Sequence, residues 1–312
     1  MSDTAQASVH VPVLLHEIVA ALIPDSRFKI RESGRTPIYL DGTLGGAGHA
    51  LAIAAALKGR LMIIGLDRDA NALKRAEASL AGKAEKVILE TEDFRNLDEV
   101  LDKNDITAVD LILLDLGFSS DELDHSGRGF SFLRDEPLLM TLGDPATYLF
   151  TAKSIVNGWA EEDIANVIFA YGEERYARRI AGGIVRYREK KPIETSGELA
   201  EIVKLSVPPP YRRGKIHPAT RTFQALRIAV NDELKALEEA VAKGYARLAP
   251  KGRMAIISFH SLEDRIVKTA FRAYANEGAV LITKRPIRPT DQEAAENPRS
   301  RSAKLRIIEK TA

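Results

Sequence analysis

The sequence of 312 residues contains no cysteine. This absence excludes disulfides, thiolate metal sites and cysteine nucleophiles, and it suits a reducing cytosol. No uncharged apolar run approaches the roughly 18 residues that a membrane span needs, so we expect no membrane partner. Residues 1–24 contain no Lys or Arg, which is unlike a signal peptide or an arginine-rich transit peptide. The expected location is cytoplasmic.

Neither sign of charge dominates the chain, since 45 Lys and Arg residues oppose 44 Asp and Glu residues for a net charge of +1. A hydrophobic content of 45% is ample for a core and excludes a disordered composition. The length suits about two domains, or one large domain with an insertion.

The most informative stretch runs from Ile38 to His49. A short apolar run ends at Asp41, four glycines follow within seven residues, and an alanine-rich segment over 50–57 reads as a helix. Glycine has no Cβ and tolerates positive φ, so a strand–turn–helix of this kind brings backbone close to a ligand. The helix N-terminus then offers free N–H groups to an anion. The alternative for such a glycine string is an ordinary tight turn.

A second apolar run ends at Asp67, nineteen residues after Gly48. In βαβ nucleotide sites an acid about 20 residues beyond the turn accepts hydrogen bonds from ribose hydroxyls. The spacing is Asp-Gly-x-x-Gly-Gly-x-Gly rather than G-x-G-x-x-G. An adenosine ligand with a small anionic tail therefore fits better than a dinucleotide, and a nicotinamide dehydrogenase is a distant alternative.

Alternating strands and helices predict an α/β fold with a doubly wound, mostly parallel sheet. The alternation stops between about residue 122 and residue 221, where only helices are expected. We therefore predict a discontinuous domain over 1–121 and 222–312 with an inserted helical domain over 122–221. Strands are expected at 38–40, 61–66, 86–90, 109–115, 253–259, 279–284 and 304–309, and helices at 13–23, 70–80 (capped by Asp69), 164–171, 175–187, 197–205 and 223–248.

Basic residues gather in three stretches, 175–191, 204–231 and 284–306. Each could be an ordinary solvated face. Together, in a nearly neutral chain, they favour a surface for a phosphate backbone. Single-stranded or looped RNA would suit a helical module with Tyr211 and Phe223 exposed nearby.

Two loops at strand ends carry candidate chemistry. Asp115 closes the strand over 109–115 and is followed by Gly-Phe-Ser-Ser, and His260 follows the strand over 253–259. In open α/β sheets ligands bind at this edge. A capped turn is the structural alternative for the first loop, and Ser261 with Asp264 has the form of a capping box in the second. The histidines lack metal-binding spacing and a G-x-S-x-G elbow is absent, so we predict no metal and no serine hydrolase.

With these pieces placed, the sequence resembles class I S-adenosylmethionine-dependent methyltransferases. More specifically, it resembles the RsmH (MraW) family of bacterial 16S rRNA cytosine-N4 methyltransferases. The matching strings are His10–Leu15, Asp41–His49, Leu66–Asp69, Leu114–Ser120, Arg128–Phe132, Tyr171–Arg175, His217–Arg227, Ser258–Lys268 and Asn297–Ser302.

The resemblance implies a set of residues that bind S-adenosylmethionine. Three departures from the family pattern stand out. Ala47 replaces a usual Gly, a mild change if its φ is negative, and Glu122 replaces Gln. Leu139 and Thr141 stand where the family has Asp and Arg, which bears on RNA docking. The implied cofactor-binding residues are Asp41, Ala47, Gly48, His49, Asp67, Phe94, Asp115 and Glu122.

The implied reaction is methyl transfer to the exocyclic N4 of a cytidine in 16S rRNA within the small ribosomal subunit. An amine needs no covalent help, whereas carbon-5 methylation would require the missing cysteine. Asp115, with His260 as a second candidate, would orient the amine and take its proton, and Phe118 would stack on the base. Alternatives are another RNA site or a protein as acceptor, or a non-catalytic ribosome-assembly factor. The sequence leaves open whether the chain forms a homodimer.

Overall fold

The computed structural model describes residues 12–24, 35–117 and 126–311. The chain divides into two compact units, residues 1–117 with 234–312 and residues 118–233. The second boundary thus falls at 233 rather than at the expected 221. The single helix predicted over 223–248 was wrong, because the chain forms two helices there, α12 (Thr220–Asn231) and α13 (Glu233–Arg247). The boundary falls at the break between them. Asp232, with a left-handed φ of 51°, separates α12 from α13.

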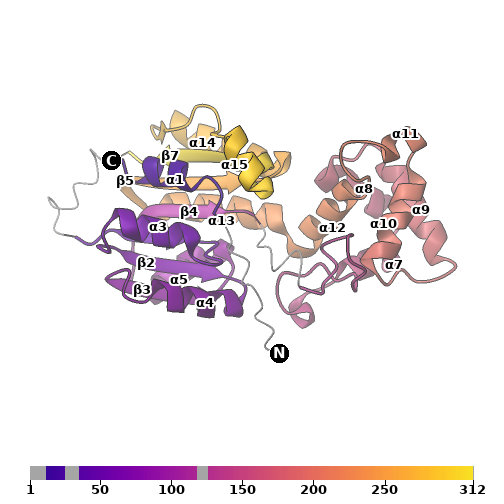
Figure 1. Cartoon of the computed structure of the whole chain (residues 1–312), viewed down its shortest axis with the longest axis horizontal. Helices are drawn as coiled ribbons and strands as arrows, with labels where there is room; N and C mark the ends of the chain where they lie inside the picture. Colours follow the sequence, from indigo (N-terminus) through magenta and orange to yellow (C-terminus); the bar gives the residue numbers. More distant parts are fainter. Residues whose placement is uncertain (1–11, 25–34, 118–125, 312) are drawn as a thin grey trace. The chain divides into compact units, whose positions relative to one another are not determined.

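The first unit is built on a seven-stranded sheet of order β3-β2-β1-β4-β5-β7-β6 (Figure 1). The first five strands in this order are parallel, and β7 runs antiparallel to both β5 and β6. The predicted doubly wound, mostly parallel sheet is therefore confirmed. Its strands are β1 (Ile38–Asp41), β2 (Met62–Asp67), β3 (Lys86–Thr91), β4 (Val109–Asp115), β5 (Leu248–Ser258), β6 (Val280–Leu281) and β7 (Lys304–Glu309).

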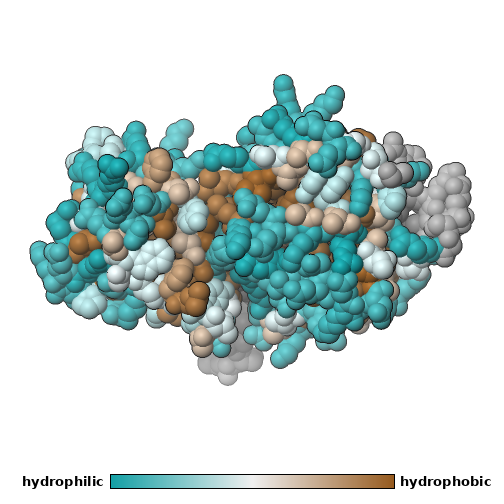
Figure 2. Space-filling model, turned by 180° about the vertical axis from the view of Figure 1, so that it is seen from behind, coloured by the Kyte–Doolittle hydropathy of each residue, from teal (hydrophilic) through white to brown (hydrophobic). Residues whose placement is uncertain are grey.

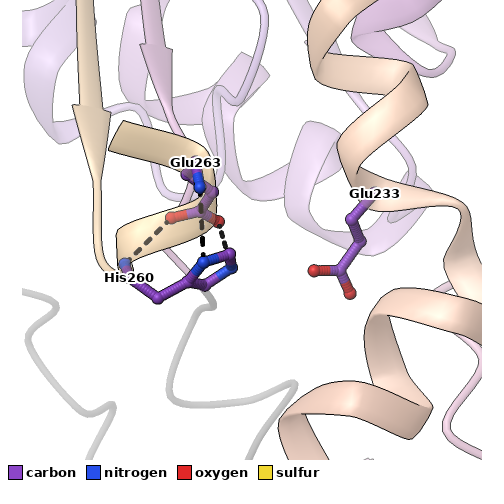
Figure 3. A group of neighbouring side chains, drawn as sticks. All are labelled: Glu233, His260 and Glu263. Atoms are coloured by element: carbon purple, nitrogen blue, oxygen red, sulfur yellow. Dashed lines mark hydrogen bonds and ion pairs between the residues drawn. The ribbon is translucent and has the colours of Figure 1, made fainter. Parts of the chain in front are cut away.

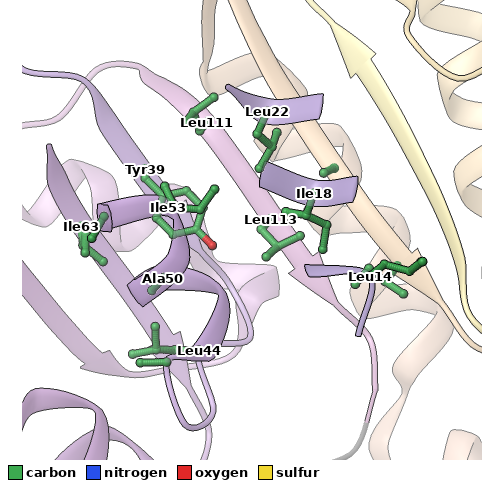
Figure 4. Close-up of a cluster of buried hydrophobic side chains, with 14 of the residues drawn as sticks. Leu14, Ile18, Leu22, Tyr39, Leu44, Ala50, Ile53, Ile63, Leu111 and Leu113 are labelled. Carbon is green, nitrogen blue, oxygen red and sulfur yellow. The ribbon is translucent and has the colours of Figure 1, made fainter. Parts of the chain in front are cut away.

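Helices cover both faces of this sheet because side chains alternate along each buried strand. Tyr39 and Leu113 face one side, where α1 and α3 pack with Ile18 and Ile53 (Figure 4). Leu40, like Ile112 and Leu114 of β4, faces the other side, where α5, α13 and α14 supply the apolar contacts. The helices of this unit are α1 (Leu15–Leu22), α3 (Gly48–Ala56), α4 (Ala70–Leu80), η1 (Phe94–Asn96), α5 (Leu97–Lys103), α13 (Glu233–Arg247), α14 (Ser261–Asn276), α15 (Asp291–Glu296) and η3 (Pro298–Ser302).

The second unit consists of helices around its own apolar core. The predicted helices over 164–171 and 197–205 are confirmed within the longer helices Glu161–Gly172 and Ser196–Ser206. The helix predicted over 175–187 is confirmed with a later start, as Ala177–Arg188. Thr151 and Thr195 begin two of the helices with capping boxes, which satisfy N–H groups that the helix itself cannot. The elements are η2 (Pro145–Thr147), α7 (Ala152–Gly158), α8 (Glu161–Gly172), α9 (Ala177–Arg188), α10 (Ser196–Ser206), α11 (Pro209–Arg212) and α12 (Thr220–Asn231).

Phe223 was expected on the surface of this unit, and that expectation was wrong. Its side chain is 4% exposed and meets Phe132 edge to face in the core. Thr141 is also fully buried, so its side chain is part of the core rather than of a docking surface.

Polar side chains cover most of the molecular face seen in Figure 2. Among the described helices, none combines the length and the apolar character needed to cross a membrane.

Candidate functional site

The loop after β1 is joined by hydrogen bonds to the strands on either side of it. The Gly42 amide donates to the Leu113 carbonyl of β4 at 3.0 Å, and the Leu44 amide donates to the Leu66 carbonyl of β2 at 2.9 Å. The Asp115 amide donates to the Thr43 hydroxyl at 2.7 Å. The order of the strands reverses between β1 and β4, because β2 and β3 lie on one side of β1 and β4 and β5 lie on the other. Open α/β sheets bind ligands at such a point. These bonds therefore bring the glycine loop and the ends of β2 and β4 together.

Glycine is required at the start of α3. A Cβ on Gly48 would lie 2.4 Å from Pro12 Cγ, whereas a Cβ on Gly46 would meet nothing within 4 Å. The loop is thus packed at Gly48 and open at Gly46. Ala47 between them has φ 63°, so the assumption of a negative φ was wrong. An L-residue in this region is strained, which explains why glycine suits the position.

Asp67 ends β2 with its carboxylate held by two backbone amides. Gly45 donates to Oδ2 and Asp69 donates to Oδ1, each at 2.8 Å. Burial raises the pKa of Asp67, and the two amide donors oppose that rise. A carboxylate can accept about four hydrogen bonds, so each oxygen keeps acceptor capacity beyond its one amide. The arrangement suits the hydroxyls of a ribose.

Phe94 follows β3 and packs partly buried beside the glycine loop. A Cβ on Gly42 would lie 3.1 Å from Phe94 Cβ, so loop and ring share one corner of the unit. The neighbouring Asp93 pairs with Arg68 and accepts from the Arg95 amide, which holds this turn in place. Phe94 thus lies beside the glycine loop, and its contact with a ligand stays a prediction.

Asp41 lies under the site rather than on its surface. Its carboxylate is 1% exposed and accepts from the Tyr39 hydroxyl at 2.8 Å and the Thr43 amide at 3.2 Å. Burial raises the pKa of Asp41 to about 6, and a nearby Asp115 contributes to the rise while His49 opposes it. Asp41 interacts electrostatically with His49 and Asp115. Direct contact between Asp41 and a cofactor stays a prediction.

His49 and Asp115 face each other across the loop. His49 Nδ1 lies 3.9 Å from Asp115 Oδ2, and His49 Nε2 lies 2.9 Å from the Val13 carbonyl oxygen. The Gly117 amide donates to Asp115 Oδ1 at 3.3 Å. Both side chains are largely buried. The structure thus brings together two residues that the sequence predicted separately.

His260 is engaged in capping α14, as Figure 3 shows. Its Nδ1 accepts from the Glu263 amide at 3.4 Å, and Glu263 Oε2 accepts from the His260 and Phe259 amides at 3.2 and 2.7 Å. The predicted capping box of Ser261 with Asp264 was therefore wrong by one residue. The error arose because histidine is an uncommon cap.

Asp264 has a different partner set. It accepts from Arg306 at 2.7 Å and Lys304 at 3.3 Å on β7. Burial raises the pKa of its carboxyl, but the two cations outweigh burial and lower it overall. This ion cluster ties α14 to the sheet.

Two of the predicted site residues, Phe118 and Glu122, lie outside the residues that the structure describes. Two others were missed. Thr43 accepts the Asp115 amide, and Tyr39 donates to Asp41. A hydroxyl inside the glycine loop was a usable signal for Thr43, whereas nothing in the sequence separates Tyr39 from a core residue.

The fold and the site define a Rossmann-like protein of the class I methyltransferase type. Its glycine loop and the acids closing β2 and β4 meet where the strand order reverses. The chain belongs to the MraW methylase family, whose sequence model matches residues 7–311.

Curated relatives agree with this assignment. A protein of Heliobacterium modesticaldum named Ribosomal RNA small subunit methyltransferase H is 46% identical over 318 residues, covering 96% of this chain and 98% of that protein. Its namesake in Brevibacillus brevis is 44% identical over 317 residues, with 96% and 98% coverage. A third, from Geotalea uraniireducens, is 45% identical over 318 residues with the same coverage.

Proposed function

We propose that this chain transfers the methyl group of S-adenosylmethionine to the exocyclic N4 of a cytidine in 16S rRNA of the small ribosomal subunit. The relatives' shared name supports the rRNA substrate. The observation that carries the proposal is the bond from the Asp115 amide to the Thr43 hydroxyl, 2.7 Å long. This bond fixes an acid beside the loop that would hold the cofactor.

The residues of the loop fit S-adenosylmethionine. Ala47 begins α3 without a side-chain cap, so the first N–H groups of this helix can receive the carboxylate tail. Asp67 would accept from the ribose hydroxyls, and Phe94 would contact the adenine. The cofactor supplies an activated methyl group on a sulfonium. The protein therefore contributes position and electrostatics rather than a covalent step.

Asp115 could serve the amine that accepts the methyl group. An amine lone pair attacks a sulfonium methyl directly and needs only alignment and an acceptor for one proton. Asp115 supplies a carboxylate at the end of β4 for both tasks. The base must leave its stack to reach the carboxylate, which costs a few kcal/mol. We expect Asp115 to orient the N4 amino group.

We infer that the helical unit contacts the RNA through α9 and the neighbouring loop. Arg178 and Arg179 lie exposed in the first turn of α9, at the positive end of the helix dipole and with no acid in that turn. Arg175 precedes them and lies over the Tyr211 ring, 5.1 Å from its centroid. Cations at this end cost stability, and they are well placed for phosphates.

Other basic residues of this unit already have partners. Lys204 pairs with Glu201 at 2.9 Å and Arg227 pairs with Glu233 at 2.9 Å. Arg212 donates to the Leu205 and Val207 carbonyls, each at 3.0 Å. The basic stretch over 204–231 therefore contributes less to an RNA surface than its count of cations indicates.

The direct test uses small subunits from cells that lack this protein, purified protein and methyl-labelled cofactor. We expect label in one cytidine of 16S rRNA, released on digestion as N4-methylcytidine, and loss of transfer in Asp115→Ala. Label in another nucleotide or in a ribosomal protein would assign a different acceptor. If calorimetry detected no binding of the cofactor, the protein would instead be a non-catalytic assembly factor.

Whether the chain forms a homodimer is testable in the same preparation. Sedimentation of the pure protein at micromolar concentration would distinguish one copy from two, with and without cofactor.

A further inference from the structure

The hydrogen bond to Val13 determines which nitrogen of His49 carries a proton. Nε2 lies 2.9 Å from the Val13 carbonyl oxygen, and a carbonyl can only accept. Nε2 must therefore carry the hydrogen. Neutral His49 then holds its lone pair on Nδ1, the nitrogen that faces Asp115.

His49 and Asp115 would attract each other strongly only with one more proton between them. Nδ1 and Asp115 Oδ2 are 3.9 Å apart, and in the neutral-imidazole state both atoms are acceptors. A proton added between them turns this contact into an imidazolium–carboxylate pair, which is favourable at low exposure. His49 is 8% exposed, so solvent screens the contact little.

Charged and polar groups from β1 and from the α1 side surround His49. Asp41 on β1 is coupled by charge to both His49 and Asp115, and Tyr39 on β1 donates to Asp41. On the α1 side, His49 meets the Val13 carbonyl, and Glu293 of α15 accepts the Leu14 amide at 2.7 Å. Asp41 and Asp115 are thus two carboxylates that lie close to the imidazole.

We propose that His49 is the proton-accepting partner of Asp115 during methyl transfer, an inference that rests on the proposed function. The N4 lone pair attacks the methyl carbon and displaces the sulfur, which keeps the bonding electron pair. The N4 proton passes to Asp115 Oδ2 and on to His49 Nδ1, and solvent receives it between turnovers. His49 acts through Asp115 and is a positioning residue, not one that touches the substrate.

His260 is less suited to this role. Its Nδ1 already accepts the Glu263 amide, and its Nε2 lies 3.1 Å from Glu263 Oε1. Nδ1 is thus occupied by the helix cap, and Nε2 lies beside the carboxylate of the same cap. The geometry favours His49 over the histidine that the sequence put forward.

His49→Gln separates the two functions of the ring. The glutamine amide nitrogen, Nε2, can donate to the Val13 carbonyl as histidine Nε2 does, while glutamine has no group that titrates near neutrality. His16→Gln, at an exposed histidine on α1, is the matched control. Single-turnover methyl transfer to undermodified small subunits is measured from pH 5.5 to 9, with cofactor affinity from calorimetry.

At a cofactor concentration that saturates each protein, we expect His49→Gln to transfer at least about tenfold more slowly than the wild type. The transfer rate of the wild type should increase with pH over part of the range. His16→Gln should keep this increase, and both His49→Gln and Asp115→Asn should lack it; this rising part of the profile is called the limb. The inference would be overturned if His49→Gln transferred methyl groups at the wild-type rate, or if it were slow but its rate still rose with pH. Wild type that makes no N4-methylcytidine would instead overturn the proposed function.

Folding of His49→Gln is checked by its melting temperature and its cofactor affinity. If this variant does not fold, the pH profile of Asp115→Asn decides. Retention of the limb in Asp115→Asn would overturn the relay.

Discussion

The Gly45 amide donates to Asp67 Oδ2 at 2.8 Å, so the glycine turn and the acid closing the next strand hold each other in place. The second oxygen of Asp67 accepts the Asp69 amide at the same distance. A carboxylate fixed from both sides by backbone loses little conformational freedom when a ligand arrives. The two amides therefore set the orientation in which Asp67 meets a ribose.

Asp67→Asn should weaken S-adenosylmethionine binding by about 10- to 100-fold, because an amide nitrogen cannot accept the hydrogen bonds that the lost oxygen accepted. Asp69→Ala is the matched control two residues away. It removes the cap that accepts from the Asn71 amide and should cost about 1 kcal/mol of stability with cofactor affinity retained. Calorimetry and urea unfolding measure both. Equal affinity for Asp67→Asn and wild type would contradict the assignment.

Asp41→Asn should change how stability depends on pH. Burial raises the pKa of Asp41 from 3.8 to about 6, so the folded state binds this proton more tightly than the unfolded chain. The free energy of unfolding contributed by Asp41 therefore falls as pH rises from about 4 to about 6, and it is constant above.

We expect Asp41→Asn to gain about 2 to 3 kcal/mol relative to wild type across that window. Urea unfolding without cofactor, at half-unit steps from pH 4 to 8, measures the difference between the two proteins. Two parallel curves would show that Asp41 ionises normally in the fold.

Ala47→Gly should leave stability nearly unchanged. The glycine relieves a left-handed backbone, worth about 1 kcal/mol, and loses one buried methyl group, worth about 0.8 kcal/mol. Ala50→Gly removes a similar methyl from the interior of α3 and adds a helix-propensity loss, so it should cost about 1 to 2 kcal/mol. Thermal and urea unfolding compare them. Equal losses would argue against strain at Ala47.

Tyr211→Phe should destabilise the helical unit by about 1 to 3 kcal/mol. Its hydroxyl donates to Glu174, which is fully buried and also accepts the Tyr176 amide at 2.8 Å. Burial and the Glu174 carboxylate raise the pKa of Tyr211 to about 12, so the donor stays protonated. Tyr176→Phe keeps that donor and should change stability by less than about 0.5 kcal/mol. Similar losses in both variants would point to ring packing instead.

Arg178→Ala with Arg179→Ala should weaken binding of small-subunit RNA and lower the salt dependence of that binding. For single-stranded contacts the slope of log affinity against log salt falls by about 0.7 per lost phosphate contact. Lys191→Ala is the control, since Lys191 is exposed but pairs with Glu198 at 2.6 Å. Filter binding from 50 to 300 mM salt measures the slopes. An unchanged slope in the double variant would place the RNA elsewhere.

Local patterns in the sequence determined much of the fold. β4 runs over the expected Val109–Asp115, because a strand buried on both faces is a nearly continuous apolar run in the sequence. α4 follows the expected cap, Asp69, because capping depends on residues a few positions apart. The glycine spacing and Asp67 indicated the ligand site for the same reason, since a short βαβ unit contains both.

Only the tertiary structure decided the rest. The pairing of His49 with Asp115, the burial of Phe223 and the left-handed backbone of Ala47 depend on contacts between distant segments. The break at Asp232 and the transfer of the α14 cap to His260 likewise reflect backbone geometry that several residue types can adopt. Residue type and spacing therefore identified the chemistry of the site, whereas packing between distant elements determined which side chains face one another.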